Sequence, residues 1–410
     1  MSGEKSVAPV TSAYLDYAAA TPLEPEVLEA MYPYLTGRFY NPSAPYAEAR
    51  SVRADLEAAR ATLARCIGAR PGNVTLTAGA TEANNLAFAA TDGHVVTDAI
   101  EHESVLACAG ARPHAIVFVG PDGLIDPEDV RAAIGPATQL VSVSLANGEI
   151  GCVQPVRELS RVVSQVRDAR LAAGDLTPLH LHVDASQAAS CLTVDVGSLG
   201  CDLLTLSAAK IGGPKQVGLL WASDDVALRP LVLGGGQEGG LRSGTENVPG
   251  IIGFARALEL ACACRRKEAR RLAGLRARLE QGLLAELPWM VVSGPRKAKL
   301  RLPGLLHVSF PGLQARRLVI GLEREGVSVG TGSACAASKM RVSHVLQAIG
   351  MPAEVAEGSL RMTLGRPTTE AEVDFAVAAV TRAVRAEMGR LGLSDEAAAA
   401  NAAQLMGGAR

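Results

Sequence analysis

The first two-thirds of the chain alternates short apolar runs with stretches whose apolar residues recur at helical spacing. Six of the runs have the length and the residue types of buried strands. Strands that alternate with helices in this way form a mostly parallel sheet with helices on both faces. The runs are 74–79, 94–99, 115–120, 140–147, 179–185 and 202–208, and two of the helical stretches are 126–134 and 156–172.

The last third of the chain has a different pattern. An Arg- and Ala-rich stretch from about 252 to 287 predicts one long helix, and strand-like runs follow at 305–310 and 326–330. More helical stretches end near Met388, and the tail from Leu393 predicts either a loosely held helix or a frayed end. We therefore expect a smaller α+β domain in this part of the chain.

This change of pattern sets the predicted domain boundaries. We expect a large domain over residues 15–255 and a small domain formed by residues 1–14 together with residues 256–410. The predicted fold class is α/β, with a mostly parallel sheet in the large domain and an α+β arrangement in the small C-terminal one.

Composition and charge exclude several classes of protein. Of the 410 residues, 48% are apolar and 20% are charged, which is not the composition of a disordered chain. The net charge of -2 and the aromatic content of 3% argue against nucleic acid as the main partner. No apolar run approaches the roughly 18 residues of a membrane span, and the N-terminus lacks the apolar core of a signal peptide. We therefore expect a cytoplasmic protein.

The eight cysteines form neither a disulfide framework nor a zinc motif. They are spread along the chain, and no two of them have CxxC spacing. Cys262 and Cys264 are close in sequence, but in the predicted helix a spacing of two places them on different faces. We expect no metal site.

Ligands of open α/β sheets bind beyond the carboxyl ends of the strands, so the residues after each apolar run are the candidates for chemistry. Gly79 follows the first run and begins a helical pattern, which offers backbone N–H groups to a phosphate, with the Thr81 hydroxyl as a further donor. An ordinary helix start would have the same pattern. The motifs GxGxxG and GxxxxGK[ST], typical of dinucleotide and nucleoside triphosphate sites, do not occur.

Three further strand ends carry polar residues: His102 after the second run, Asp184 and Gln187 after the fifth, and Lys210 after the sixth. A buried lysine loses its charge easily and becomes a nucleophile towards carbonyl carbon, although in isolation Lys210 is equally compatible with a surface role. Pyridoxal phosphate needs such a lysine, a carboxylate for its ring nitrogen and a phosphate cradle. The chain has a candidate for each of the three.

With these residues the chain resembles the class V, fold-type I pyridoxal phosphate enzymes, and among them the cysteine desulfurases of the NifS/IscS kind. The resemblance covers about residues 13–385 and implies the fold-type I architecture, a homodimer and a persulfide-forming enzyme. It is carried by the motifs Tyr14–Pro22, Asn41–Ser43, Gly79–Glu82, Glu101–His102, Asn147–Gly151, Asp184–Gln187, Lys210, Gly234–Glu238, Arg242–Asn247, Gly332–Cys335 and Ser359–Arg366.

The resemblance implies a role for each matching residue. Lys210 would hold pyridoxal 5'-phosphate covalently, Asp184 would pair with its ring N–H, and His102 would stack on its ring. Arg361, with help from Asn41, would bind the α-carboxylate of L-cysteine, because a guanidinium binds carboxylates in bidentate fashion. The other cofactor contacts would be Gln187 at the ring hydroxyl, Ala80, Thr81 and Ser207 at the phosphate, and Thr245 reaching the phosphate of the second copy in a homodimer.

Cys335 is similar to the nucleophile of this family. The glycines before it allow a loop to move, and the helical pattern after it would favour the thiolate. The resemblance implies that this thiolate attacks the sulfur of L-cysteine, that L-alanine leaves, and that a persulfide stays on Cys335. The sulfur would then pass to an acceptor in Fe–S cluster assembly or tRNA thiolation.

Two positions depart from the family's pattern. Gly148 stands where the family has an asparagine that contacts the cofactor hydroxyl, and Ala209 stands where it has a histidine near the phosphate. A lost hydrogen bond to a charged group is worth about 1.5–3 kcal/mol. We therefore expect weaker cofactor binding than in relatives, and expect Gly148→Asn with Ala209→His to strengthen it.

Other functions remain open from the sequence. Selenocysteine lyases share most of these motifs, an aminotransferase of the same class would not need Cys335, and a weakly active scaffold for a sulfur carrier would tolerate Gly148 and Ala209. The basic residues between 265 and 278 would suit an acidic partner or tRNA, but such runs are most often a solvated helix face. We expect L-cysteine, a sulfur-acceptor protein and a second copy of the chain as partners, without membrane or nucleic acid.

Overall fold

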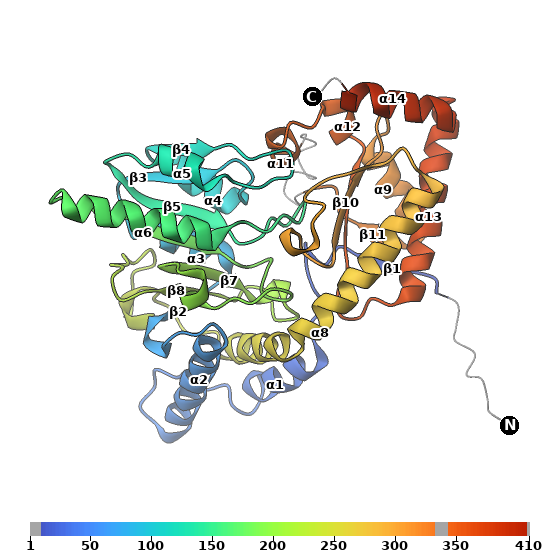
Figure 1. Cartoon of the computed structure of the whole chain (residues 1–410). Helices are drawn as coiled ribbons and strands as arrows, with labels where there is room; N and C mark the ends of the chain where they lie inside the picture. The colour runs from blue at the N-terminus through green and yellow to red at the C-terminus, as the bar shows by residue number, and fades with distance from the viewer. Residues whose placement is uncertain (1–9, 333–342, 408–410) are drawn as a thin grey trace. The chain divides into compact units, whose positions relative to one another are not determined.

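The computed structural model describes residues 10–332 and 343–407, which form two compact units (Figure 1). The larger unit consists of residues 20–267 and 295–302, and the smaller one of the described residues up to 19, of 268–294 and of those from 303 onwards. The domain boundaries after residues 14 and 255 stay a prediction, because compact units of a structure need not coincide with independently folding domains.

A seven-stranded sheet forms the centre of the larger unit. Its strand order is β2-β8-β7-β6-β5-β3-β4, and β8 runs antiparallel to both of its neighbours while the other pairs are parallel. The predicted mostly parallel sheet is confirmed. The strands are β2 (Val74–Thr77), β3 (His94–Asp98), β4 (His114–Val117), β5 (Thr138–Ser144), β6 (His180–Asp184), β7 (Leu203–Ser207) and β8 (Gly218–Ala222).

Several helices of the larger unit pack against this sheet, and the two predicted from spacing are present as α5 and α6. A core of buried apolar residues, among them Leu86, Phe88, Val105, Leu140 and Leu220, packs α3 and α4 against the strands. The helices are α1 (Pro25–Leu35), α2 (Ala47–Cys66), α3 (Ala80–Phe88), α4 (Glu103–Gly110), α5 (Pro127–Ala133), α6 (Val156–Ala172), α7 (Val196–Leu199) and the first part of α8 (Val248–Glu286), with short turns η1 (Pro71–Asn73), η2 (Ala208–Lys210), η3 (Glu238–Gly240) and η4 (Ala298–Leu300).

The smaller unit is α+β, as expected. An antiparallel sheet of order β12-β10-β9 lies beside the parallel pair β1-β11, and isolated bridges at Asp16–Thr363 and Gly330–Arg361 join the two. The strands are β1 (Ala13–Leu15), β9 (Val291–Val292), β10 (Leu305–Ser309), β11 (Val327–Val329) and β12 (Ser359–Thr363).

Helices complete the smaller unit, and the second part of the long helix α8 is one of them. The chain after Leu393 is helical, and Ala398 and Ala402 on it are buried, so the helix is held by packing rather than frayed. The other helices are α9 (Ala315–Arg324), α11 (His344–Ala348), α12 (Ala353–Ala356), α13 (Glu370–Leu391) and α14 (Asp395–Gly407). Within the described ranges, none of the helices has the length and apolarity that crossing a membrane requires.

Candidate active site

The carboxyl ends of the parallel strands meet at one edge of the large sheet, and most predicted site residues of the larger unit follow them. Asp184 is the last residue of β6, Ser207 is the last residue of β7, and Lys210 ends the η2 turn directly after it. His102 is the residue before α4, and α3 begins just after β2. Since β6 and β7 are hydrogen-bonded neighbours, the sheet brings Asp184 and the Lys210 turn to the same edge.

A chain of hydrogen bonds connects Asp184 with His102. The Asn84 amide on α3 donates to the Asp184 carboxylate and to the Ser104 hydroxyl, both at 2.9 Å. The Ser104 hydroxyl lies 2.8 Å from Nδ1 of His102. A second donor, the backbone N–H of Ser186, lies 2.9 Å from the Asp184 carboxylate. These contacts fix the orientation of Asp184 in a site where it is only 8% exposed.

The same contacts define the tautomer of His102. Its Nδ1 accepts the backbone N–H of Ser104 at 3.1 Å, and so caps the first turn of α4. The Ser104 hydroxyl accepts from Asn84 and donates its own proton to that Nδ1. A ring nitrogen that accepts hydrogen bonds carries no proton, so neutral His102 holds its proton on Nε2. The imidazole is exposed, and its Nε2 edge is the one available to a ligand.

Glu101 fixes the segment that precedes His102. It is fully buried, and its carboxyl group accepts hydrogen bonds from the backbone N–H and the hydroxyl of Ser144 at the end of β5. Burial, together with the nearby carboxylate of Asp98, raises the pKa of Glu101 well above its usual value. The hydrogen bonds to Ser144 therefore hold the segment that precedes His102 at the end of β5.

The turn that carries Lys210 is braced by a segment from much earlier in the chain. The hydroxyl of Thr21 donates to the Ala209 carbonyl and accepts the Gly212 N–H, both at 2.9 Å. Glu24 donates its backbone N–H to the Gly212 carbonyl at 3.0 Å. Gly212 has a φ of +77°, a conformation that other residues rarely adopt. The half-buried Lys210 side chain therefore projects from a turn of fixed shape.

The start of α3 has the geometry of an anion site. Its N-cap is Gly79, which has no side chain to accept the first N–H groups, and Ala80 and Thr81 form the first turn. Gly218 on β8 allows Gly79 to approach the sheet, since a Cβ at Gly218 would lie 2.7–2.8 Å from backbone atoms of Gly79. Ala80 is half-buried and Thr81 exposed, so this turn faces open space.

Gln187 lies against one of the two positions that depart from the family's pattern. A Cβ at Gly148 would lie 2.9 Å from the amide carbon and nitrogen of Gln187. The Gln187 side chain thus occupies part of the space that an asparagine at 148 would need. The Gly148→Asn substitution expected above to strengthen cofactor binding would therefore also displace Gln187.

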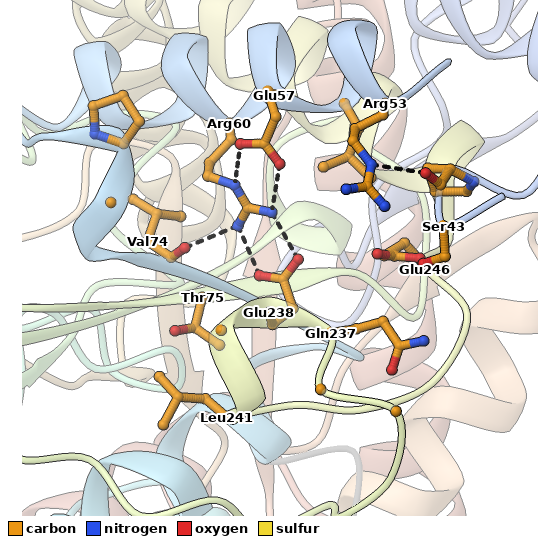
Figure 2. A pocket seen from close by; sticks show the side chains of 17 residues that line it. Ser43, Arg53, Glu57, Arg60, Val74, Thr75, Gln237, Glu238, Leu241 and Glu246 are labelled. Carbon is orange, nitrogen blue, oxygen red and sulfur yellow. Dashed lines mark hydrogen bonds and ion pairs between the residues drawn. The ribbon is translucent and has the colours of Figure 1, made fainter. Parts of the chain in front are cut away.

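Thr245 lies on an exposed loop that a buried ion pair holds to α2. Arg60 donates two hydrogen bonds of 2.7 Å to the Glu238 carboxylate, and Glu238 also accepts the backbone N–H of Leu76 at 2.8 Å (Figure 2). The side chain of Glu238 is only 4% exposed. A cavity of about 650 Å³ lies between α2 and this loop, and Figure 2 shows Arg60 reaching into it between Glu57 and Glu238.

Arg361 belongs to the smaller unit, where it lies on β12 and is 4% exposed. Its guanidinium donates to Asp16 at 2.7 Å, and its backbone pairs with that of Gly330. His307 lies opposite Arg361 on β10, and burial together with this cation lowers the pKa of His307 to about 3. Arg361 is therefore a buried cation whose neighbouring histidine is neutral.

Two predicted positions remain, the substrate contact Asn41 and the nucleophile Cys335. Asn41 is exposed in the loop before α2, and its amide oxygen accepts the Ser43 N–H at 2.8 Å. Cys335 lies outside the described residues. In the part of the chain that is described, no group of three or more His, Cys, Asp or Glu residues could hold a metal ion.

The structure adds four residues that the sequence analysis did not select: Asn84, Ser104, Thr21 and Arg60. Thr21 lies within one of the motifs quoted above, and Ser104 lies two residues after His102. Their positions in the sequence could therefore have marked both as site residues. Asn84 lies inside a helix and Arg60 inside another, and neither position differs from an ordinary polar helix residue. Their roles depend on contacts with residues 100 and 178 positions away.

Comparison with known proteins gives a consistent result. A family model described as aminotransferase class-V matches residues 13–375. The chain is 39% identical over 383 residues to the cysteine desulfurase IscS of Dictyoglomus turgidum, which covers 90% of this chain and 94% of that protein. Among solved structures it is similar to a NifS-like protein (TM-score 0.82, 31% identity, 90% of this chain and 98% of that one) and to SspA in complex with cysteine (TM-score 0.71, 31% identity, 86% and 99%).

Proposed function

The chain belongs to the aminotransferase class-V family and is a cysteine desulfurase, and on this premise we propose that Lys210, His102 and Cys335 are its catalytic residues and pyridoxal 5'-phosphate its cofactor. The observation that carries the proposal is the hydrogen-bonded series from His102 through Ser104 and Asn84 to Asp184, at the sheet edge that also bears Lys210.

The residues at this edge fit pyridoxal 5'-phosphate. The uncapped first turn of α3, with Ala80, Thr81 and the nearby end of β7 at Ser207, offers N–H and hydroxyl donors to a phosphate. Asp184 is a buried carboxylate oriented by two donors, which suits the protonated ring nitrogen. Gln187 lies beside Gly148, and in our proposal its amide serves the ring hydroxyl in place of the missing asparagine.

Each residue has a defined task in the proposed reaction. Lys210 would hold the cofactor through its side-chain amine, the group that the amine of L-cysteine would replace. The cofactor supplies the electron sink that allows the Cα proton of the substrate to leave. His102 would lie against the ring of the cofactor, and its Nε2 is the atom suited to exchange a proton, because its Nδ1 is held by Ser104.

Binding of the substrate carboxylate is assigned to Arg361, with Asn41 as a second donor. A guanidinium has five N–H donors in a fixed fork, and the ion pair with Asp16 engages one terminal nitrogen. Asp16 therefore orients the guanidinium, whose planar fork of donors matches the geometry of a carboxylate. This assignment rests on the family resemblance and on the buried, oriented cation.

Sulfur transfer is assigned to Cys335. Its thiolate attacks the substrate sulfur, an S–S bond forms, and the C–S bond breaks with its electron pair left on the carbon that becomes the methyl group of L-alanine. The sulfur stays on Cys335 as a persulfide, and an acceptor thiolate removes it by attack on the outer sulfur. We propose a sulfur-carrier protein of Fe–S cluster assembly or tRNA thiolation as the acceptor.

We further propose that the enzyme is a cytoplasmic homodimer. Thr245 is exposed on its loop, as a residue that serves a second copy would be. Large apolar side chains are also exposed on the same unit: Phe39 is 69% exposed and Leu233, which precedes the Thr245 loop, is 80% exposed. Exposed aromatic and aliphatic residues of this size are typical of a subunit interface.

The experiment that tests this proposal is the substitution Lys210→Ala. The purified wild-type protein should be yellow and form L-alanine from L-cysteine, whereas Lys210→Ala should lose both the covalently held cofactor and the activity. Lys267→Ala, at an exposed position on α8, is the control and should behave as wild type. Alanine formation by Lys210→Ala at the wild-type rate would contradict the proposal.

A further inference from the structure

Cys66 and Cys262 lie against each other at a contact between two helices of the larger unit. Cys66 is the last residue of α2, and Cys262 lies on the first part of α8, which passes α2 (Figure 1). The Cys262 thiol donates to the backbone oxygen of Cys66 at 3.8 Å, and the two side chains are close enough for each to shift the pKa of the other. Both residues are half-buried, so small reagents in solvent can reach them.

The surroundings of the pair make the two thiols chemically different. Arg265 lies one turn beyond Cys262 and is held in place by a 3.1 Å hydrogen bond to the Leu192 carbonyl. The hydrogen bond from Cys66 and the charge of Arg265 lower the pKa of Cys262 to about 6, and the same hydrogen bond, with burial, raises the pKa of Cys66. Cys262 is thus the more acidic of the two thiols and the first to form the reactive thiolate.

The other two charged groups at this contact act on the pKa of Cys66 in opposite directions. Arg65, next to Cys66 on α2, and Glu259, one turn before Cys262 on α8, form an ion pair of 3.6 Å. The effect of Arg65 on the Cys66 thiol opposes that of Glu259. Arg265 is therefore the charge that distinguishes Cys262 from Cys66.

Cys264 provides an internal comparison. Its sulfur lies 3.8 Å from the Ala261 carbonyl of its own helix, and like Cys262 it is half-buried. Cys264 lies on the same helix as Cys262, two residues further along, and is exposed to a similar degree. It lies on another face of α8, as the spacing of two residues predicted.

We propose that Cys262 and Cys66 are a redox-active pair, in which Cys262 reacts with peroxide and Cys66 closes a reversible disulfide between α2 and α8. A thiolate beside a resolving thiol in an accessible, electropositive setting is the arrangement that such chemistry requires. The pair is separate from the proposed nucleophile Cys335, and its reaction does not depend on the desulfurase mechanism.

The reaction balances with hydrogen peroxide as the oxidant. The Cys262 thiolate attacks one peroxide oxygen, an S–O bond forms, the O–O bond breaks, and the departing hydroxide takes up a proton to become water. The Cys66 sulfur, which gives up its proton, then attacks the Cys262 sulfur, the S–S bond forms, the S–O bond breaks, and a second water leaves. Two thiols have been oxidised and one peroxide reduced, and a dithiol reductant reverses the change by exchange.

The first test is peptide mapping of the full-length holoenzyme after treatment with one equivalent of hydrogen peroxide at pH 7. We expect a cross-linked peptide that contains Cys66 and Cys262 and disappears with dithiothreitol. Cys264→Ser should form the same cross-link. Cys66→Ser should instead give a sulfenic acid at Cys262 that dimedone traps, and Cys262→Ser should leave Cys66 unoxidised. Absence of the cross-link in the wild type, or oxidation of Cys66 in Cys262→Ser, would overturn the proposal.

A second measurement uses the unsubstituted protein and so does not depend on any variant folding. The rate of Cys262 alkylation by iodoacetamide, followed by mass spectrometry between pH 5 and 9, should reach half of its maximum near pH 6, because only the thiolate reacts. A half-maximum above pH 8 would show an ordinary thiol and overturn the proposal.

Discussion

Asn84 connects two side chains at the proposed site, the carboxylate of Asp184 and, through Ser104, the ring of His102. It is fully buried within α3, and its amide supplies both donors of the connection. A hydrogen bond from an amide to a carboxylate contributes about 1.5–3 kcal/mol. Loss of the Asn84 amide should therefore weaken the binding of a cationic group by Asp184.

This leads to a prediction for Asn84→Ala. The variant should bind pyridoxal 5'-phosphate about tenfold more weakly or worse, because Asp184 loses one of its two orienting donors and the contact to Ser104 is broken. The dissociation constant can be measured by titrating the apoprotein and following absorbance. Asn85→Ala is the matched control, since Asn85 is exposed and its amide bonds only to the Thr81 carbonyl among the described contacts. Equal affinities of the Asn84→Ala variant and the wild type would contradict the role given to Asn84.

The sequence allowed Lys210, Asp184 and His102 to be proposed as site residues, because each follows an apolar run, and their roles stay predictions. It was not sufficient for Asn84, since an asparagine inside a helix has no local signal and acquires its role by a contact with β6. Nor did it show that Gln187 fills the space beside Gly148. That packing depends on how two strand ends meet, and it changes what an asparagine at 148 would do.

Among the elements, the contact between α2 and the loop of residues 234–247 holds Thr245 in place. The Arg60–Glu238 pair is almost fully buried, with side-chain exposures of 11% and 4%. Glu238 also has a φ of +51°, a conformation that residues other than glycine seldom adopt. The ion pair and the N–H of Leu76 together stabilise this strained position.

Arg60→Ala should therefore be strongly destabilising. Removing one partner of a buried pair leaves the Glu238 charge uncompensated and costs about 3–5 kcal/mol. Arg65→Ala on the same helix is the control: its pair with Glu259 spans 3.6 Å and is exposed, so its loss should cost about 1 kcal/mol or less. Denaturant unfolding monitored by circular dichroism measures both. Similar free energies of unfolding for the two variants would mean that the Arg60–Glu238 pair does not hold the loop.

The elements of the parallel sheet were largely predictable, because each strand is a short apolar run between turn residues. The strand β8 was missed, as were β1, β9 and β12 of the smaller unit. β8 lies antiparallel between β2 and β7, two strands that are more than a hundred residues apart in the sequence. The five residues of β8 carry no local signal that predicts pairing with either strand. Strand pairing of this kind is set by the tertiary structure, not by the local pattern.

For the whole molecule, the proposed homodimer predicts that exposed apolar residues beside the Thr245 loop are essential for association. Leu233→Asp, which places a charge at a site that is 80% exposed in the single chain, should produce monomers and reduce retention of pyridoxal 5'-phosphate. Leu176→Asp is the matched control, since Leu176 is 82% exposed but lies beyond the end of α6, and it should remain dimeric. Analytical ultracentrifugation distinguishes the two states.

If Leu233→Asp sediments like the wild type, or if the wild type itself is a monomer at micromolar concentration, the proposed role of Thr245 in a second copy is wrong. The predicted redox pair is independent of this outcome, because Cys66 and Cys262 belong to one chain and one unit.

The most direct test of the proposed function is the location of sulfur after turnover. Wild-type protein given L-cysteine without a reductant should carry one extra sulfur atom on the peptide that contains Cys335, as found by mass spectrometry of peptides prepared under non-reducing conditions. Cys335→Ala should change its absorbance on addition of L-cysteine, since Lys210, Asp184 and Arg361 are intact, but should release neither sulfide nor L-alanine. Full desulfuration of L-cysteine by Cys335→Ala, or extra sulfur only on other peptides of the wild type, would contradict the account.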